Sequence, residues 1–365
     1  MNTVLIVDPR GVIPRGGSDV LERHLRYKES LEQTNKQYTL KIISHAQRGS
    51  KDSYRNLIDC EPSFIKFLRK LRSDLLNGSV SIIVCGDPWE SYWTVALTQK
   101  LMRTKKPVQV QLHGDIGNPS WKRMNVRNFL RQMLSGIALN SASQIRTVSS
   151  EQRDLLIKSW PKTKDKSFVA SVPYLSETQL SEVDFKSKPR KSLGYVGRLH
   201  SDRGIDQFIE IAKLALNHIQ DIKIEIVGAG PSEAKLKREL SPYEAKKQIT
   251  FHGHLTKNQM KEAWNRIGVL ISTPKAESFG RAVREALIRG IPVLATHTSG
   301  IQSIQNRVGN DFLRTFSDTT SEGAILKDIQ DLIEISVPLS KTQFLYQDEE
   351  NSLQTLIQHW INNAR

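Results

Sequence analysis

The sequence predicts an α/β protein made of two Rossmann-like domains, each built on a parallel sheet, which face each other across an interdomain cleft. Three observations favour this fold class. Short apolar runs alternate with amphipathic stretches, which is typical of parallel sheets covered by helices on both faces. The chain has 365 residues, too many for one ordinary core. A polar segment containing Pro189 separates two such series, as expected of a linker.

The expected strands are apolar runs too short for helices. In the first series they are Val4–Val7, Leu40–Ile43, Ser81–Cys85, Val108–Leu112, Gln144–Val148 and Phe168–Val172. In the second series they are Ser192–Val196, Ile222–Val227, Ile249–His252, Val269–Ile271 and Pro292–Ala295. Helices between them are expected from apolar residues at helical spacing, as in Val20–Leu31, Ile65–Leu76, Gln207–Leu216 and Arg281–Arg289.

These elements predict an N-terminal domain over residues 1–187 and a C-terminal domain over residues 192–345, joined at Ser187–Lys191. Residues 346–365 form a terminal helix whose apolar face needs a partner. Its apolar residues are Leu353, Leu356, Ile357 and Trp360. Ligands of parallel sheets bind at the carboxyl ends of the strands, so we expect a ligand in the cleft.

Composition and charge narrow the partners. No apolar run approaches the length of a membrane helix, the N-terminus lacks the features of a signal peptide, and two cysteines indicate a reducing compartment. We therefore expect a cytoplasmic protein.

The positive charge is unevenly distributed along the chain. Residues 1–187 carry 29 Lys/Arg and 18 Asp/Glu, a net charge of +11, against +4 for the remainder. This imbalance indicates an anionic partner, such as a phospholipid surface at the inner face of the membrane, or serves solubility alone. With 7% aromatic residues and no nucleic-acid motif, nucleic acid is disfavoured.

The most informative segment is Ser272–Gly300, which contains one helix between two strands. Ser278 can cap that helix, leaving the amides of Ser278, Phe279 and Gly280 facing forward, an arrangement that binds phosphate. The carboxylates of Glu277 and Glu285 flank this helix start. The alternative is that both are solvated charges.

Two further segments lie at strand ends in the second half. Gly197 is followed by Arg198 and, five residues later, by Arg203, and two guanidinium groups can clamp a diphosphate. The alternative is a pair of solvated arginines. Gly228 and Gly230 follow another strand, and we interpret them mostly as a structural turn because the dinucleotide fingerprint is incomplete.

In the first half, Gly16 and Gly17 precede a helix, which suggests a phosphate or acceptor loop or a plain capped loop. His113 follows a strand, where an imidazole can donate a hydrogen bond to a sugar or relay a proton, although such a histidine can also be structural. In Trp121–Leu134, basic and apolar residues interleave. This favours a helix at an anionic membrane surface or one packed on its own domain. No Asp-x-Asp clamp, Walker loop or zinc spacing is present, so we expect no metal and no cofactor.

Together these segments resemble glycosyltransferase family 4, of GT-B fold. The resemblance spans residues 194–300 in order and spacing, and is looser before them. It is carried by Gly197-Arg198-Leu199, Arg203-Gly204, Gly228-Ala229-Gly230-Pro231, Phe251-His252-Gly253-His254-Leu255 and Glu277-Ser278-Phe279-Gly280 to Glu285-Ala286, with Gly16-Gly17, His113-Gly114 and Val148-Ser149 in the first half.

The resemblance implies a retaining, metal-independent transfer of a hexose from a UDP- or GDP-sugar to a glycan or lipid-linked acceptor, in polysaccharide or glycoconjugate synthesis. The N-terminal domain would face the acceptor and the C-terminal domain would bind the nucleotide sugar. The catalytic residues would be Arg198, Arg203, Glu277 and His113. Donor contacts would come from Gly16, Gly17, Gly228, His254, Leu255, Ser278, Phe279, Gly280 and Glu285.

Two departures stand out. The family usually has Lys where this chain has Arg203, and Ser299 replaces the first glycine of a pair that an acidic residue usually follows. Both bear on donor contacts. The alternatives are an inverting transferase or epimerase of the same fold, and a non-catalytic basic binding protein for an anionic partner. Because the two arginines and two glutamates are intact, we favour the enzyme.

Overall fold

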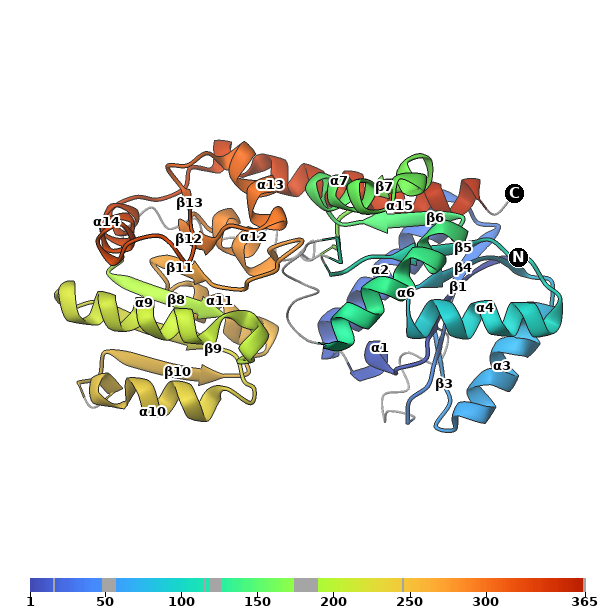
Figure 1. Ribbon diagram of the computed structural model, residues 1–365, viewed down its shortest axis with the longest axis horizontal. Helices are drawn as coiled ribbons and strands as arrows, with labels where there is room; N and C mark the ends of the chain where they lie inside the picture. The colour runs from blue at the N-terminus through green and yellow to red at the C-terminus, as the bar shows by residue number, and fades with distance from the viewer. Residues whose placement is uncertain are drawn as a thin grey trace. The chain divides into compact units, whose positions relative to one another are not determined.

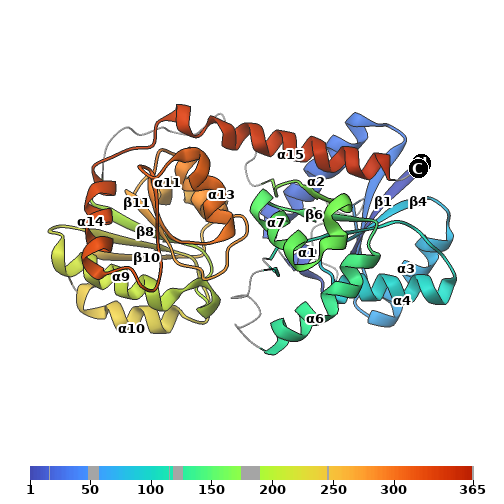
Figure 2. The same cartoon turned by 45° about the horizontal axis from the view of Figure 1, so that its top comes forward.

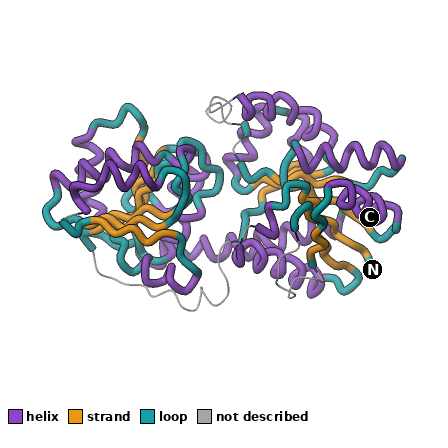
Figure 3. Tube along the Cα trace, turned by 90° about the horizontal axis from the view of Figure 1, so that it is seen from below, coloured by secondary structure: helices purple, strands orange, loops and turns teal. Residues whose placement is uncertain are grey.

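The computed structural model describes residues 1–15, 17–47, 57–114, 116–117, 126–173, 190–244 and 246–363. The chain divides into two compact units: unit 1 comprises Met1–Tyr174 with Asp348–Arg365, and unit 2 comprises Leu175–Gln347. In each unit a central sheet is enclosed by helices (Figure 1, Figure 3). The two sheets are parallel throughout the described strands. The predicted fold class, two parallel-sheet Rossmann-like domains, is confirmed.

The sheet of unit 1 has the strand order β3-β2-β1-β4-β5-β6-β7. The strands are β1 (Asn2–Asp8), β2 (Tyr38–Ser44), β3 (Ile58–Cys60), β4 (Val80–Cys85), β5 (Val108–Gln111), β6 (Gln144–Thr147) and β7 (Ser167–Val169). The direction in which strands are added reverses between β1 and β4. The carboxyl ends of these two strands therefore form the topological switch point of unit 1.

Helices cover both faces of this sheet. One face packs against α3 (Phe64–Leu76), α4 (Glu90–Met102), α6 (Val126–Ser141) and α7 (Ser150–Ser159). The other packs against α2 (Gly17–Thr34) and α15 (Gln343–Asn362). The short elements α1 (Val12–Arg15) and η2 (Pro161–Lys166) lie in connections. Because both faces are covered, the strands are almost wholly buried and their sequences run apolar rather than alternating.

The sheet of unit 2 has the order β10-β9-β8-β11-β12-β13. Its strands are β8 (Ser192–Val196), β9 (Lys223–Val227), β10 (Ile249–Gly253), β11 (Val269–Ser272), β12 (Val293–Thr296) and β13 (Leu313–Phe316). Its helices are α9 (Ile205–His218), α10 (Glu233–Glu244), α11 (Lys257–Trp264), α12 (Arg281–Ile288), α13 (Ser299–Val308) and α14 (Glu322–Ile333), with η3 (Ser201–Arg203) and η4 (Leu339–Lys341). The switch point here lies between β8 and β11.

Every predicted strand is present, with ends that differ by a few residues. The sequence analysis missed β3 and β13. Each is short, and their sequences, IDC and LRTF, contain too few consecutive apolar residues to stand out. None of the described helices has the length and apolar character needed to span a bilayer.

Helix α15 returns the chain to unit 1, where Figure 2 shows it beside α2. Leu356, Ile357 and Trp360 are fully buried. The Trp360 indole packs edge-on against Tyr27, with ring centroids 5.7 Å apart, and its Nε1 donates to Gln109 Oε1 over 3.0 Å. Arg26 Nη1 lies 2.5 Å from the buried carboxylate of Glu349. The terminal helix is therefore part of the unit 1 core.

We predict that Trp360→Ala lowers the free energy of unfolding of unit 1 by about 3–5 kcal/mol, as expected for truncation of a buried aromatic residue. Urea unfolding followed by circular dichroism measures this change. The control is Gln358→Ala on the exposed side of the same helix, which should change the value by less than about 0.5 kcal/mol. Equal effects of the two variants would contradict the packing described for α15.

Candidate active site

Two loops meet at the switch point of unit 2, one after β8 and one after β11. Gly204 ends the first loop with φ of +66°, and a Cβ atom there would lie 1.8 Å from the carbonyl oxygen of Thr273 in the second. Thr273 Oγ1 also donates to the carbonyl oxygen of Arg203 over 3.0 Å. The two loops are thus in direct backbone contact, which glycine alone permits.

This contact brings Arg203 and Glu277 together, although they are 74 residues apart in the sequence. Arg203 Nη1 lies 2.9 Å from Glu277 Oε2, and both side chains are partly buried. The other carboxylate oxygen of Glu277 accepts a hydrogen bond from the Phe279 amide over 3.2 Å. Glu277 is therefore fixed from two sides. Two of the predicted catalytic residues form one ion pair.

A third segment, the start of α13, supports the Glu277 loop. The Gly300 amide, in the first turn of α13, donates to the Glu277 carbonyl over 2.9 Å. A Cβ atom on Gly300 would lie 2.5 Å from the Phe279 nitrogen, so a larger residue would displace the loop. Gly300 thus has a packing role, and Ser299, which stands in place of the first glycine of the family's pair, is buried.

Helix α12 begins at Arg281 with Gly280 as its N-cap, at φ of +69° and without a side-chain capping bond. The expectation that Ser278 caps this helix is wrong, because the helix starts two residues later than a Ser278 cap requires. As the N-cap residue, Gly280 has no side chain with which to cap α12. An anion can bind at such a helix start.

The segment after Glu277 is held by Arg284, which the sequence analysis missed. Its buried guanidinium lies 4.4 Å above the Phe279 ring, and Nε donates to the Phe279 carbonyl over 2.9 Å. Glu285 is the next residue, and it pairs with Arg281 one turn earlier in α12, at 2.7 Å, with most of its own side chain buried. The predicted carboxylates Glu277 and Glu285 therefore both have arginine partners, Arg203 and Arg281.

Arg198 differs from Arg203 in being exposed. Its Nη2 lies 3.4 Å from Asp202 Oδ2, and the side chain is 65% exposed. An ion pair of this length and exposure contributes little, so another anion can replace Asp202. The structure places Arg198 on the same loop as Arg203, without a described contact to the Arg203–Glu277 pair.

The Gly228–Gly230 turn shapes the loop that carries Arg198. Cβ atoms at Gly228 and Gly230 would lie 1.8 and 2.4 Å from the carbonyl oxygens of Gly197 and Leu199. In addition, the amides of Gly197 and Leu199 donate to the carbonyl oxygens of Val227 and Ala229, each over 3.0 Å. This agrees with the interpretation of a structural turn, and the donor contact expected of Gly228 stays a prediction.

The next loop contains the predicted base-binding residues. His254 is exposed and Leu255 half-buried, directly after Gly253, whose carbonyl accepts from the Gly228 amide over 2.8 Å. Just before this loop, His252 Nε2 lies 2.6 Å from the buried carboxylate of Glu225 on the neighbouring strand. The sequence analysis missed this pair. The sequence signal for this pair is the acidic residue Glu225 within the apolar run of β9.

In unit 1, His113 follows β5, where protein atoms surround its imidazole densely although solvent still reaches part of the ring. Desolvation by the surrounding protein and the positive charges of Arg146 and Arg23 lower the pKa of His113, so its imidazole is neutral at neutral pH and can donate one hydrogen bond. Gly16 lies outside the described residues. Gly17 is the first residue of α2, which begins three residues earlier than predicted.

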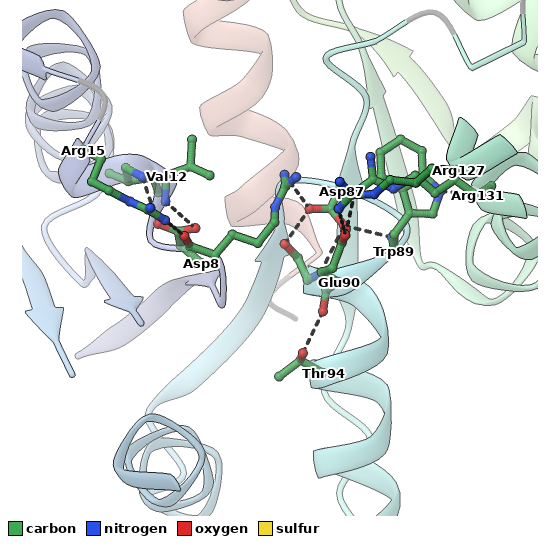
Figure 4. Close-up of polar contacts among 12 residues, drawn as sticks. Asp8, Val12, Arg15, Asp87, Trp89, Glu90, Thr94, Arg127 and Arg131 are labelled. Atoms are coloured by element: carbon green, nitrogen blue, oxygen red, sulfur yellow. Dashed lines mark hydrogen bonds and ion pairs between the residues drawn. The ribbon is translucent and has the colours of Figure 1, made fainter. Parts of the chain in front are cut away.

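Two aspartates at the switch point of unit 1 were not expected from the sequence (Figure 4). Asp8 ends β1, and its carboxylate accepts from the amides of Val12 and Ile13 over 3.0 and 2.9 Å. Asp87 follows β4 and accepts from the Trp89 and Ser91 amides and from Arg10 over 3.1 Å. Both carboxylates organise the loops that follow their strands. An acidic residue directly after an apolar run was the available signal.

A buried guanidinium lies near the carboxyl ends of β5 and β6. Arg146 is 1% exposed, and it donates to the carbonyls of Ala170 and Ser171 over 2.8 and 2.6 Å and to Gln111 Oε1 over 3.2 Å. Its described acceptors are neutral, so its positive charge is available to the surroundings. This charge contributes to the lowered pKa of His24 and His113.

Among the described residues, no cluster of three His, Cys, Asp or Glu side chains could hold a metal ion.

Part of the chain is similar to a known protein family and to characterised proteins. Residues 176–343, slightly less than half of the chain, match the family model "Glycosyl transferases group 1". A GDP-mannose-dependent alpha-mannosyltransferase of Corynebacterium glutamicum is 28% identical over 127 residues, 35% of this chain and 28% of that protein. A 2-deoxystreptamine N-acetyl-D-glucosaminyltransferase of Niallia circulans is 23% identical over 143 residues, 39% of this chain and 33% of that protein. The alignments thus span about a third of these curated relatives.

Solved structures resemble the chain over nearly its whole length. Anabaena HepE, solved with UDP and glucose, has a TM-score of 0.71 at 17% identity and covers 99% of this chain and 100% of its own. A glycosyltransferase from Rickettsia africae has a TM-score of 0.71 at 16% identity, covering 100% and 99%. At this identity the likeness shows the fold, which is the GT-B architecture.

We predict that Gly204→Ala lowers the free energy of unfolding of unit 2 by more than about 3 kcal/mol, because its Cβ atom would overlap the Thr273 carbonyl. The matched control is Gly253→Ala. Gly253 has nearly the same φ, +65°, but no atom lies within 4 Å of its added Cβ. It should lose only the about 1–2 kcal/mol of the left-handed conformation. Equal losses in urea unfolding would show that the loop contact is not tight.

We predict that acid destabilises unit 1 through His24. This ring is buried, and desolvation, helped by Arg23, lowers the pKa of His24 from 6.5 to about 4. Between these values the unfolded state binds more protons, so stability is complete above pH 6.5 and is lost as the pH falls towards 4. Taken alone, the shift corresponds to about 2 kcal/mol between pH 7.5 and pH 5. Urea unfolding at both values should show a smaller pH dependence for His24→Gln than for the wild type. The same dependence in both would contradict this origin.

Proposed function

We propose that the protein is a retaining, metal-independent glycosyltransferase that moves a hexose from a UDP- or GDP-sugar to a glycan or lipid-linked acceptor. The observation that carries the proposal is the Arg203–Glu277 ion pair at the switch point of unit 2, beside a helix start capped by Gly280. This pair lies inside the region that matches glycosyl transferases group 1. The relatives' names, a GDP-mannose-dependent transferase and an N-acetylglucosaminyltransferase, support a nucleotide-sugar donor.

In the proposed reaction, the bond between the sugar carbon and the diphosphate breaks, an acceptor hydroxyl oxygen bonds to that carbon, and the hydroxyl proton passes to the departing diphosphate. The sugar becomes oxocarbenium-like while the diphosphate gains negative charge. Arg198 and Arg203 stabilise that charge, and the amides of Phe279 and Gly280 bind phosphate or sugar hydroxyls. Because Glu277 already holds Arg203 in place, the guanidinium is positioned before the donor arrives. Such preorganisation is the main source of electrostatic catalysis.

The remaining donor contacts follow the same proposal. Glu277 lies beside the sugar, with Ser278 next to it, and Glu285 accepts hydrogen bonds from the ribose hydroxyls. His254 and Leu255 border the base, above the turn at Gly228. In unit 1, Gly16 and Gly17 approach the diphosphate, and the neutral imidazole of His113 contacts the transferred sugar. The buried positive charge of Arg146 in the same unit favours an anionic ligand.

We predict that Arg198→Ala reduces kcat about 100- to 1,000-fold while the fold stays intact, because one preorganised donor to the departing diphosphate is removed. Donor hydrolysis, the slow transfer to water, is measured for a panel of UDP- and GDP-sugars in the presence of EDTA. Arg238→Ala is the matched control, since this arginine of unit 2 is similarly exposed. A loss below tenfold would remove Arg198 from catalysis.

The same assay tests Glu277. Glu277→Ala should abolish hydrolysis, whereas Glu334→Ala, which removes an exposed carboxylate of unit 2, should leave it unchanged. Hydrolysis that needs added Mg²⁺ would contradict the metal-independent proposal, and NMR of the first sugar product distinguishes retention from inversion. If no nucleotide sugar is hydrolysed and none raises the melting temperature, the alternative of a non-catalytic anion-binding protein replaces the enzyme.

A further inference from the structure

Helix α6 has its polarity inverted relative to an ordinary surface helix. Its buried residues are Ser135, Ala138 and Leu139, mostly small or polar. Its outward face carries six large apolar side chains that are 49–76% exposed: Val126, Phe129, Leu130, Met133, Leu134 and Ile137. They recur at intervals of three and four residues, so they form one continuous stripe, which we call the α6 stripe. Single exposed apolar residues are ordinary, but a contiguous row marks an interaction surface.

Polar contacts hold the helix in this orientation (Figure 4). Arg131 turns inward, where its guanidinium lies 4.6 Å above the Trp89 ring and 2.5 Å from Glu90 Oε1. The Trp89 indole in turn donates to the Arg131 carbonyl and to Ser135 Oγ, over 2.9 and 2.8 Å. These bonds would break if α6 rotated to bury its stripe. The exposure of the stripe is therefore built into unit 1.

The charges around the stripe indicate what covers it. Helix α6 contains Arg127, which is 70% exposed and lies 3.1 Å from Glu90 Oε1, and the helix has no acidic residue. The adjoining η2 contributes the exposed Lys162 and Lys164, and Lys166 fastens it to the end of α6 through the Asn140 and Ala142 carbonyls. Lys122 and Arg123, which precede α6 in the sequence, lie outside the described residues. An apolar stripe bordered by cations matches the interface of an anionic bilayer.

A second copy of the chain fits less well. In a two-fold dimer the same surface patch meets itself, so the cations that border one stripe would face those of the other. Helix α6 has no carboxylate to compensate for this repulsion. Of the neighbouring carboxylates, Glu90 is already shared by Arg127 and Arg131, and η2 has only Asp165. Lipid tails, in contrast, cover the apolar stripe while the phosphate groups meet the arginine and lysine heads, whose long side chains can reach outward.

We propose that the α6 stripe docks unit 1 onto an anionic lipid bilayer, with the helix lying in the plane of the interface. This docking does not depend on the proposed transferase activity, because it needs neither donor nor acceptor. It deepens that function in one respect, since a docked unit 1 would meet a lipid-linked acceptor at the membrane surface.

The test is flotation of the full chain with vesicles of phosphatidylcholine containing about 30% phosphatidylglycerol, compared with phosphatidylcholine alone. Binding should be strong to the anionic vesicles and should weaken as salt rises from about 0.05 to 0.5 M. The double variant Met133→Ser/Ile137→Ser should reduce partitioning at least about tenfold. Its matched control, Leu97→Ser/Leu101→Ser, removes two equally exposed apolar residues from α4 and should bind like the wild type.

The charge contribution has its own pair of variants. Arg127→Gln should weaken partitioning about fivefold, and Lys327→Gln on the exposed side of α14 should not. Circular dichroism and melting curves verify that each variant folds. Equal binding of the stripe variant and the wild type, or no binding to either kind of vesicle, would overturn the proposal. Concentration-dependent dimers that the stripe variant abolishes, in a chain that ignores vesicles, would assign the surface to a second copy instead.

Discussion

The candidate site of unit 2 depends on close backbone approach at a few glycines. Gly204 touches the Thr273 carbonyl, Gly228 touches Gly197, and Gly300 touches the Glu277–Phe279 segment. Each contact joins two loops that leave different strands, so the loops form one rigid assembly at the switch point. The Arg203–Glu277 pair is a consequence of this assembly, because side chains 74 residues apart can meet at 2.9 Å only when their backbones are fixed. A methyl group at Gly204 would therefore displace the pair.

Unit 1 is organised by a different principle, in which buried charges order the loops. Asp8 and Asp87 satisfy amides at the starts of the following helices, and Arg146 binds backbone carbonyls at the ends of β5 and β6. A buried guanidinium among neutral acceptors costs stability unless it is well hydrogen-bonded, and the neutral His24 nearby avoids adding a second charge. This positive environment is suited to an anionic ligand, at the cost of stability in acid.

The sequence predicted the two-sheet fold well because its strands are buried on both faces and appear as unbroken apolar runs. It could not reveal β3 or β13, whose few apolar residues look like loop. At the site, glycines and charged residues following strands identified the Arg203–Glu277 neighbourhood. The cap of α12, the anchoring by Arg284 and the Glu225–His252 pair depend on three-dimensional packing that residue spacing does not encode. The close approach of Gly228 to Gly197 explains why a glycine stands at this position. The donor contacts of Arg198, His254 and Glu285 are proposals that concern a bound ligand.

The sequence of helix α6 indicates an apolar face and a basic face, but it does not indicate which of the two faces the domain. The interleaved basic and apolar residues fit equally well a helix packed on its own domain and a helix at a membrane, because periodicity gives the faces but not which face turns inward. The Trp89–Arg131–Glu90 contacts show which face turns inward, since they draw a charged side chain inward and leave the apolar stripe exposed. Exposing six large apolar residues costs solubility, and natural surfaces rarely keep such a row without a partner. In the proposed docking, the excess positive charge of the first half of the chain would draw the same surface towards anionic lipid before the stripe makes contact.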